Sequence, residues 1–256
     1  MSIESAVDSI PDRIVAVIPA RLASTRLPRK VLREIAGEPM LVWVWHAARA
    51  CARLDQVIIA TDSAEVMAFA KIRGFPAMLT SPGCPSGTDR VHAVAQSVPA
   101  EIYVNIQGDE PLLRPEHLDA LLSPFARPEV EVATIATPCA PDQIANPNAV
   151  KVVTASDGRA LYFSRATIPY DRDRDGNIPY RKHQGIYAYR RAALDRFTSL
   201  PPSRLEQIER LEQLRFLENG IGVYVTETPF DTIGVDTEED LQEVERILAA
   251  RPRPGS

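Results

Sequence analysis

The segment 19–30 (PARLASTRLPRK) combines small residues with four cationic side chains, directly after a buried apolar run. Small residues at 23–25 let backbone N–H groups approach an anion. Arg21, Arg26 and Lys30 can neutralise its charge. The Walker A pattern is absent, so this is not a P-loop. The segment predicts a triphosphate-binding loop, and a solvated basic loop is the alternative.

Two acidic segments offer ligands for a hard divalent cation. In 105–111 (NIQGDEP), Asp109 follows an apolar strand and Gly108 permits a sharp turn. Mg²⁺ takes one or two protein carboxylates together with substrate phosphates. Asp236, in 234–241 (GVDTEEDL), is a candidate for the second carboxylate. The alternatives are a turn that Asp109 caps and a helix N-cap, because Asp236-x-x-Glu239 is also a capping pattern.

Two further segments give weaker signals. The turn 86–90 (SGTDR) opens a predicted helix, and its N–H groups could hold a base or a phosphate; an ordinary helix start is the alternative. His183 lies among Arg181, Lys182 and Tyr187, but a single histidine is more often structural than functional.

The elements that position these segments alternate between strands and helices in the first half of the chain. Strands separated by helices of about ten residues indicate βαβ units on a mainly parallel sheet, whose ligands bind at the carboxyl ends of the strands. The predicted strands are 13–19, 56–60, 77–79 and 101–106, and the predicted helices are 40–53, 64–73, 89–96 and 115–122.

The second half is richer in strands. Asp157-Gly158 between two of them is a hairpin signal, and 171–181 (DRDRDGNIPYR) is a charged, turn-rich loop. Ser203 and Glu206 form a capping box that opens a helix predicted to end near Asn219, before Gly220. The remaining predictions are strands at 130–138, 149–155, 160–165, 185–190 and 221–226, and a last helix at 237–250.

Composition excludes several classes of protein. The 256 residues carry 29 Lys+Arg and 34 Asp+Glu, and this net charge of −5 argues against a dedicated nucleic-acid binder. The longest apolar run, 40–45, is far shorter than a membrane helix, and residues 1–11 do not resemble a signal peptide. The separated cysteines Cys51, Cys84 and Cys139 fit reduced thiols in a cytoplasm. We expect an extension at 1–12, one α/β domain at 13–250 and a disordered tail at 251–256.

Together these segments resemble the 3-deoxy-manno-octulosonate (KDO) cytidylyltransferases, also called CMP-KDO synthetases, from about residue 14 to 248. The FSRA–IP and H-x-GIY segments distinguish this family from other sugar-acid cytidylyltransferases. The matching strings are IPARLASTRLPRK (18–30), ATDS (60–63), SGTDR (86–90), VNIQGDEPL (104–112), NPNAVKVV (146–153), ALYFSRATIPYDRD (160–173), HQGIYAYR (183–190), LEQIERLEQLRFLENG (205–220) and GVDTEEDL (234–241).

The resemblance implies an α/β fold of the nucleotide-diphospho-sugar-transferase type, with a mainly parallel sheet, flanking helices and a strand-rich segment at 130–200 for dimerisation and sugar binding. It implies a homodimer that uses Mg²⁺ to join CTP and KDO into CMP-KDO and pyrophosphate, for lipopolysaccharide biosynthesis. By position, it assigns CTP phosphates to Arg21, Ser24 and Lys30, cytidine to Gln107, Ser86, Gly87 and Arg90, Mg²⁺ to Asp109 and Asp236, and KDO to Arg165, His183, Tyr187, Glu209 and Gln213.

Two of these assignments carry a geometric expectation. Glu209 and Gln213 are four apart on the predicted helix, so they are expected to face one side. Arg165 offers a planar fork for the sugar carboxylate, and the alternative is an ion pair with Asp171 or Asp173.

The chain also departs from the family pattern, and other functions stay open. Arg29 and Val31 stand where the family usually has Gly and Pro, and Cys84 stands where a polar residue is more common. The other functions are a cytidylyltransferase for 8-amino-KDO or sialic acid and a non-catalytic nucleotide-binding module, which would be expected to lack one of the paired carboxylates. The absence of G-x-G-x-x-G after the first strand argues against a dehydrogenase.

Overall fold

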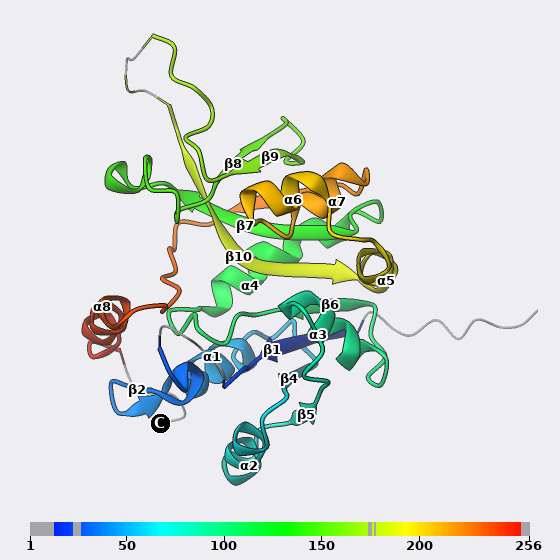
Figure 1. The fold of residues 1–256 in the computed structure, drawn as a ribbon, viewed down its shortest axis with the longest axis vertical. Coiled ribbons are helices and arrows are strands. Elements are labelled where there is room, and N and C mark those ends of the chain that lie inside the picture. The colour runs from blue at the N-terminus through cyan, green and yellow to red at the C-terminus, as the bar shows by residue number, and fades with distance from the viewer. Residues whose placement is uncertain (1–12, 23–26, 174–175, 177, 252–256) are drawn as a thin grey trace, which may run out of the picture.

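The fold is built around one mixed sheet. The structure is a computed structural model that describes residues 13–22, 27–173, 176 and 178–251. Within those ranges nine strands form a sheet with the order β11-β7-β10-β6-β1-β4-β5, and β8 and β9 extend it beside β10 (Figure 1). The predictions for residues 23–26, which include Ser24 and Arg26, for the extension at 1–12 and for the end of the tail at 252–256 lie outside the described residues.

The parallel half of the sheet contains β1 (Ile14–Pro19), β4 (Gln56–Thr61), β5 (Ala77–Leu79) and β6 (Ile102–Asn105). The chain passes from β1 outward to β4 and β5, and then returns to place β6 on the other side of β1. The order of strands therefore reverses beside β1. Parallel sheets bind ligands at such switch points, outside the carboxyl ends of the strands.

Four helices connect these parallel strands to one another and to the rest of the sheet. They are α1 (Met40–Arg49), α2 (Ala64–Arg73), α3 (Gly87–Ala95) and α4 (Pro115–Leu122). The predicted extension of α1 to residue 53 is wrong. The chain turns after Arg49 so that Asp55 can exchange hydrogen bonds with Ile14 and begin β4 beside β1.

In the second half, strands run in both directions. β10 (Arg181–Arg190) is antiparallel to β6 and to β7 (Val132–Pro138), whereas β11 (Val223–Glu227) is parallel to β7. β8 (Lys151–Thr154) and β9 (Ala160–Ser164) form the predicted hairpin. β10 begins four residues before the predicted strand, because residues 181–184 already pair with β7.

The helices of the second half differ most from the predictions. The helix expected at 203–219 is two helices, α6 (Arg204–Glu209) and α7 (Leu214–Glu218), because Arg210 adopts a left-handed conformation with φ 55°. The expectation that Glu209 and Gln213 share one helix face is therefore wrong. α5 (Arg191–Ser199) is an additional helix. The chain is completed by α8 (Glu238–Leu248), β2 (Glu34–Ile35), β3 (Glu38–Pro39) and the 3₁₀ turns η1 (Lys30–Leu32), η2 (Ser123–Ala126) and η3 (Pro141–Gln143).

Hydrophobic packing covers both faces of the sheet and fixes α8. Successive residues of β1 alternate between the faces: Ala16 and Ile18 belong to the cluster that contains residues of α1, α2 and α4, and Val15 and Val17 to the cluster that contains residues of α3 and α5. A third cluster joins Leu241, Val244 and Leu248 of α8 to α1 and the loop after β6. None of the described helices combines the length and the apolar character needed to cross a bilayer.

The first prediction concerns Arg29, which has φ 58°, a conformation that favours glycine. Arg29→Gly and Arg29→Ala both remove the exposed ion pair with Glu65. The difference in unfolding free energy between the two variants therefore isolates the effect of the backbone conformation. We expect Arg29→Gly to exceed Arg29→Ala in unfolding free energy by about 1 kcal/mol, because a Cβ is strained at this φ. Urea unfolding measures both; an alanine variant as stable as the glycine variant would contradict this reading.

Candidate active site

The ammonium group of Lys30 lies between two carboxylates that are distant in the sequence. Its Nζ donates to Asp109 Oδ2 at 2.5 Å and to Asp236 Oδ1 at 3.0 Å. Lys30 follows β1, Asp109 follows β6, and Asp236 precedes α8. The two predicted acidic segments and the predicted basic loop thus meet at the switch point between β1 and β6.

Backbone contacts fix this meeting. A Cβ on Gly108 would lie 2.9 Å from the carbonyl oxygen of Pro19, so only glycine lets the loop after β6 pass the end of β1 so closely. Val235 N donates to Asp109 O at 2.9 Å. This bond attaches the segment that carries Asp236 to the loop that carries Asp109.

The segment between β11 and α8, residues 228–237, is anchored by hydrogen bonds from β10 and from α4. Gln184 Nε2, on β10, donates to Phe230 O at 2.8 Å. His117 Nε2, on α4, donates to the same oxygen at 3.0 Å, since its Nδ1 accepts from Arg114 N. Figure 1 shows this connection running in orange from β11 to the red helix α8. Asp236 is therefore held from both ends.

The structure corrects the N-cap expected at Asp236. The cap of α8 is Thr237, whose hydroxyl accepts from Asp240 N, while Asp240 Oδ2 accepts from the amides of Asp236 and Thr237. The capping box is thus one residue later than the Asp236-x-x-Glu239 pattern. The carboxylate of Asp236 has a different partner, Lys30.

The electrostatics of this cluster suit a hard cation. Burial lowers the pKa of Lys30, but the charges and hydrogen bonds of Asp109 and Asp236 outweigh it and raise the pKa overall. One ammonium and two carboxylates leave a net charge of −1. Within the described residues no three His, Cys, Asp or Glu side chains form a metal cluster, so Mg²⁺ here would complete its shell with substrate oxygens or water.

The predicted nucleotide-binding residues are divided between the surface and the interior. Arg21 is exposed and donates to the carbonyl of Cys84, just before the 86–90 turn. Ser86 caps α3 with Asp89 in a complete capping box, and Gly87 is the first helical residue. Gln107 Nε2 lies 3.5 Å from Gly185 O and 3.4 Å from Asn105 Oδ1. Because Arg21 follows β1 directly and contacts Cys84, the 86–90 turn lies beside the end of β1.

Arg90 is placed differently from the prediction. Its side chain is completely buried, and it donates to Thr80 Oγ1 at 2.5 Å and to Asp62 Oδ2 at 2.8 Å. A guanidinium with no exposed surface cannot touch a bound nucleotide. Arg90 instead fixes the start of α3 to the ends of β4 and β5.

Arg165 is also held within the protein. Its Nε donates to Glu209 O at 2.7 Å, Nη1 to Pro147 O at 3.0 Å and Nη2 to Arg210 O at 3.4 Å. Among the described residues it forms no ion pair with Asp171 or Asp173, the alternative expectation. Its guanidinium thus joins the end of α6 to the loop before β8.

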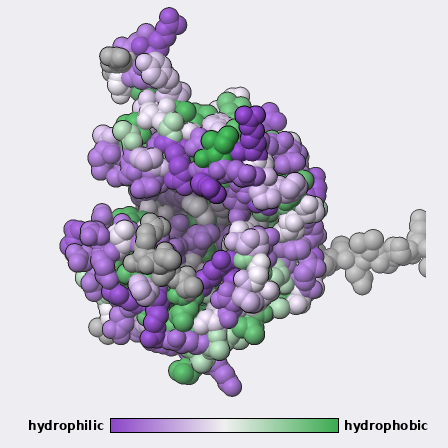
Figure 2. Space-filling view, in the orientation of Figure 1, coloured by the Kyte–Doolittle hydropathy of each residue, from purple (hydrophilic) through white to green (hydrophobic). Residues whose placement is uncertain are grey.

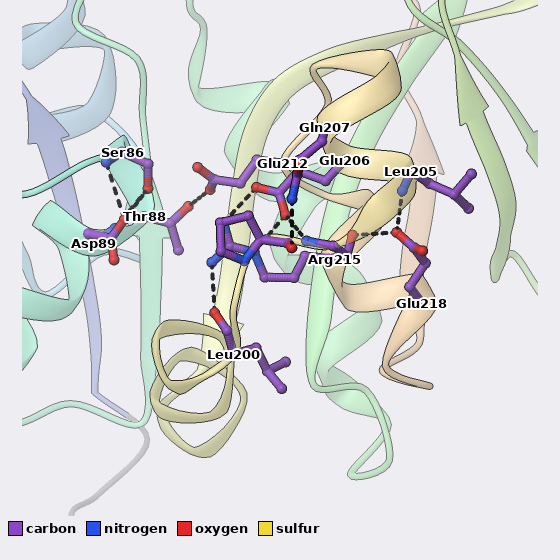
Figure 3. A network of polar contacts seen from close by, with 12 residues as sticks. Ser86, Thr88, Asp89, Leu200, Leu205, Glu206, Gln207, Glu212, Arg215 and Glu218 are labelled. Atoms are coloured by element: carbon purple, nitrogen blue, oxygen red, sulfur yellow. Dashed lines mark hydrogen bonds and ion pairs between the residues drawn. The ribbon is translucent and has the colours of Figure 1, made fainter.

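The turn between α6 and α7 reaches the 86–90 turn. Glu209 accepts from Ser164 Oγ at 2.6 Å and from Arg165 N at 3.0 Å, whereas Gln213 is buried and its Nε2 has no partner in the described part of the chain. Between them, Glu212 accepts from the Thr88 hydroxyl (Figure 3). The predicted sugar and cytidine segments are therefore in direct contact.

Two carboxylates at the border of the site are shielded from solvent: Glu110 is buried and Glu212 is half-buried. No sequence signal distinguishes them from surface acids. Burial and the nearby charge of Asp109 raise the pKa of Glu110 to about 7. Burial also raises the pKa of Glu212, against the hydrogen bonds from Thr88 and Ser86. Both lie within segments that the sequence analysis singled out, but their burial depends on contacts distant in sequence.

His183 and Tyr187 adjoin each other on β10. His183 Nε2 lies 2.9 Å from the Tyr187 hydroxyl and 3.0 Å from Thr134 Oγ1. His183 also contacts Phe163 of β9 edge-on, with ring centroids 5.0 Å apart. Desolvation lowers the pKa of His183 to about 3, so the ring is neutral at neutral pH.

The shape of the molecule agrees with a site at the switch point. Figure 2 shows a hollow between the upper part, which contains β8–β10, and the lower part, which contains β1 and α1. Another cavity, of about 700 Å³, lies beside the β8–β9 turn and β11. None of the predicted site residues lines it, and its Arg181 is already paired with Glu227.

Comparisons with known proteins agree with the sequence resemblance. A profile of the family described as Cytidylyltransferase matches residues 15–228. The 3-deoxy-manno-octulosonate cytidylyltransferase of Acidobacterium capsulatum is 68% identical over 240 residues, covering 94% of this chain and 98% of the relative. That of Koribacter versatilis is 61% identical, covering 93% and 91%. A solved structure of CMP:2-keto-3-deoxy-manno-octonic acid synthetase complexed with CTP has a TM-score of 0.90 and 41% identity, covering 94% of this chain and 100% of its own.

The second prediction concerns the neutral ring of His183. Its pKa is about 3 in the folded protein and about 6.5 in an unfolded chain, so between these values only the unfolded state binds the proton. Stability therefore falls as the pH falls below 6.5, by up to about 1.4 kcal/mol per pH unit. We expect His183→Gln to lose less unfolding free energy than the wild type between pH 7 and pH 4. Urea unfolding of both proteins across this pH range measures the difference. Parallel curves of unfolding free energy against pH would refute the prediction.

Proposed function

This chain belongs to the cytidylyltransferase family, and we propose that it joins CTP and KDO to give CMP-KDO and pyrophosphate. The product is the activated form of KDO for lipopolysaccharide biosynthesis. The observation that carries the chemistry is the convergence of Asp109, Lys30 and Asp236 at the switch point of the sheet. The choice of sugar follows from relatives that bear this name and cover nearly the whole chain.

The reaction brings two anions together, the triphosphate of CTP and the carboxylate of KDO. The anomeric hydroxyl of KDO attacks the α-phosphorus of CTP and releases its proton to solvent. A new O–P bond forms, and the bond from the α-phosphorus to the bridging oxygen breaks as pyrophosphate leaves. Such phosphoryl chemistry depends mainly on positioning and on neutralising charge. An acidic protein therefore needs local cations where the triphosphate binds.

The chain supplies these cations from the loop after β1. Arg21 is exposed beside the 86–90 turn, and Lys30 can exchange its carboxylate partners for phosphate oxygens. Ser86, Gly87 and Gln107 border the cytidine side. For the sugar acid we retain His183, Tyr187, Glu209 and Gln213, with Arg165 held by carbonyl groups at the edge of this region.

We propose Mg²⁺ as the cofactor, held by Asp109 and Asp236. The donor set fits, since both carboxylates already converge on one cationic nitrogen. When bound, Mg²⁺ would supply Lewis acidity that draws charge from the phosphate and lowers the pKa of a nearby hydroxyl. Mg²⁺ would then offset the charge of the two carboxylates, and Lys30 would neutralise part of the negative charge of the bound substrates.

The test of substrate choice is a pyrophosphate-release assay. It crosses CTP, UTP, ATP and GTP with KDO, 8-amino-KDO and sialic acid. We expect rapid release only with CTP and KDO. A preference for 8-amino-KDO or sialic acid would keep the nucleotidyltransferase assignment and replace the sugar.

The third prediction concerns the paired carboxylates. Asp109→Asn and Asp236→Asn keep the side-chain volume but each remove one anionic ligand, and we expect kcat to fall by roughly 10²–10³-fold. Glu239→Gln is the matched control, because it removes an exposed carboxylate from the same segment. Steady-state kinetics at limiting Mg²⁺ is the measurement. Near-normal turnover of Asp236→Asn would show that the site does not need two carboxylates.

We further propose that the protein is a homodimer in the cytoplasm. Apolar side chains are exposed on the strand-rich segment and on α6 next to it: Leu161 on β9, Tyr170, and Ile208 on α6 are 60%, 75% and 66% exposed. A two-fold contact would bury them. The cysteines Cys51, Cys84 and Cys139 are free thiols, which suits a reducing compartment.

The fourth prediction tests this contact. We expect the wild type to sediment as a dimer at micromolar concentration, and Leu161→Glu with Ile208→Glu to shift it toward monomer, because charges would be buried at the contact. Ile72→Glu, on α2, is the control: Ile72 is 85% exposed, and α2 packs beside β5, at the edge of the sheet away from β8 and β9 (Figure 1). A monomeric wild type, or equal effects of all three substitutions, would contradict the proposal.

A further inference from the structure

Lys151, the first residue of β8, is a completely buried lysine. Its Nζ donates to three carbonyl oxygens: Asn146 O at 2.8 Å, Ala149 O at 2.5 Å and Arg165 O at 3.1 Å. Three acceptors use all three N–H groups of an ammonium, so this geometry requires the charged form. The side chain therefore holds the loop at 146–149 against the end of β9.

The charge makes this arrangement unusual. No ion pair of Lys151 is found in the described part of the chain, and a buried charge without one is costly. A methionine could fill a similar volume without that cost. The ammonium instead provides three directional hydrogen bonds, which orient backbone carbonyls from two separate segments.

Arg165 extends this set of hydrogen bonds from a cationic side chain to backbone carbonyls. We call the bonds of Lys151 and Arg165 together the scaffold. Its Nη1 donates to Pro147 O, which lies within the loop that Lys151 holds, and its Nε and Nη2 donate to Glu209 O and Arg210 O at the end of α6. The two cations thus hold the same loop from two sides. Their carbonyl partners connect β8, β9 and α6.

The scaffold ends at a turn with functional neighbours. Arg210 is left-handed, so α6 stops and the chain turns toward Glu212 and Gln213. Glu212 accepts from Thr88 at the start of α3, as Figure 3 shows. Gln213 is buried with no partner for its Nε2 among the described residues. A displacement of this turn would therefore move the proposed sugar side relative to the 86–90 turn.

We propose that Lys151 is a positioning residue for the sugar acid, because it sets the place of the 210–213 turn through the loop at 146–149 and Arg165. The inference rests on the proposed function for the identity of the substrate. The claim that Lys151 holds the 210–213 turn in place does not depend on the proposed function.

Lys151→Met tests the inference, with Lys71→Met as the matched control. Lys71 is an exposed lysine on α2, and its replacement changes the same chemical group outside the site. Two readouts are used: amide hydrogen exchange of residues 205–218 without substrates, and steady-state kinetics with each substrate varied in turn.

We expect faster exchange across 205–218 in Lys151→Met, and a KM for KDO raised roughly ten- to hundredfold, the range that a small misplacement of a binding group produces. The KM for CTP should stay unchanged, and Lys71→Met should match the wild type in both readouts. If Lys151→Met does not fold, Lys151→Gln, which keeps two N–H donors, replaces it.

Wild-type exchange across 205–218 in the folded variant would overturn the inference. An equal rise of both KM values would overturn it too, since it would indicate a general structural role. If the wild type itself releases no pyrophosphate with CTP and KDO, the proposed function fails, while the exchange measurement still decides whether Lys151 orders the turn.

Discussion

The ammonium of Lys30 between Asp109 and Asp236 is the interaction on which the rest of the site depends. It can form only if the loop after β1, the loop after β6 and the segment before α8 arrive at one point. The parallel pairing of β1 with β6 brings the first two together, and Gly108 allows their backbones to touch. The packing of α8 on α1 and the bond from Val235 to Asp109 bring the third.

Much of the fold could be predicted where local signals are strong. α2 and α4 have the predicted bounds, because Ser63 caps α2, Gly74 ends it in a left-handed conformation and Pro115 opens α4. The break between α6 and α7 could not be predicted. Arg210 is a good helix former by propensity, yet it is left-handed in a turn whose carbonyl groups accept from the distant Arg165.

The sequence predicted which segments meet at the candidate site, but not the partners of each side chain. The types and order of residues around Asp109 and Lys30 indicate a nucleotide site, and the structure brings both together with Asp236. Whether Asp236 caps a helix or faces the site depends on a one-residue shift of the capping box. The roles of Arg90 and Arg165 depend likewise on distant partners, Asp62 and the carbonyls of 147, 209 and 210. Sequence spacing cannot specify such contacts.

The position of Asp236 has a consequence for the order in which the candidate site is assembled during synthesis of the chain. β11, the last strand, ends at Glu227, so every strand of the sheet has been made before the second carboxylate of the site. A nascent or prematurely terminated chain can therefore contain the entire sheet and still lack one member of the cluster that Lys30 forms with Asp109 and Asp236. The cluster is complete only when translation has passed Asp236 and α8 has docked on α1.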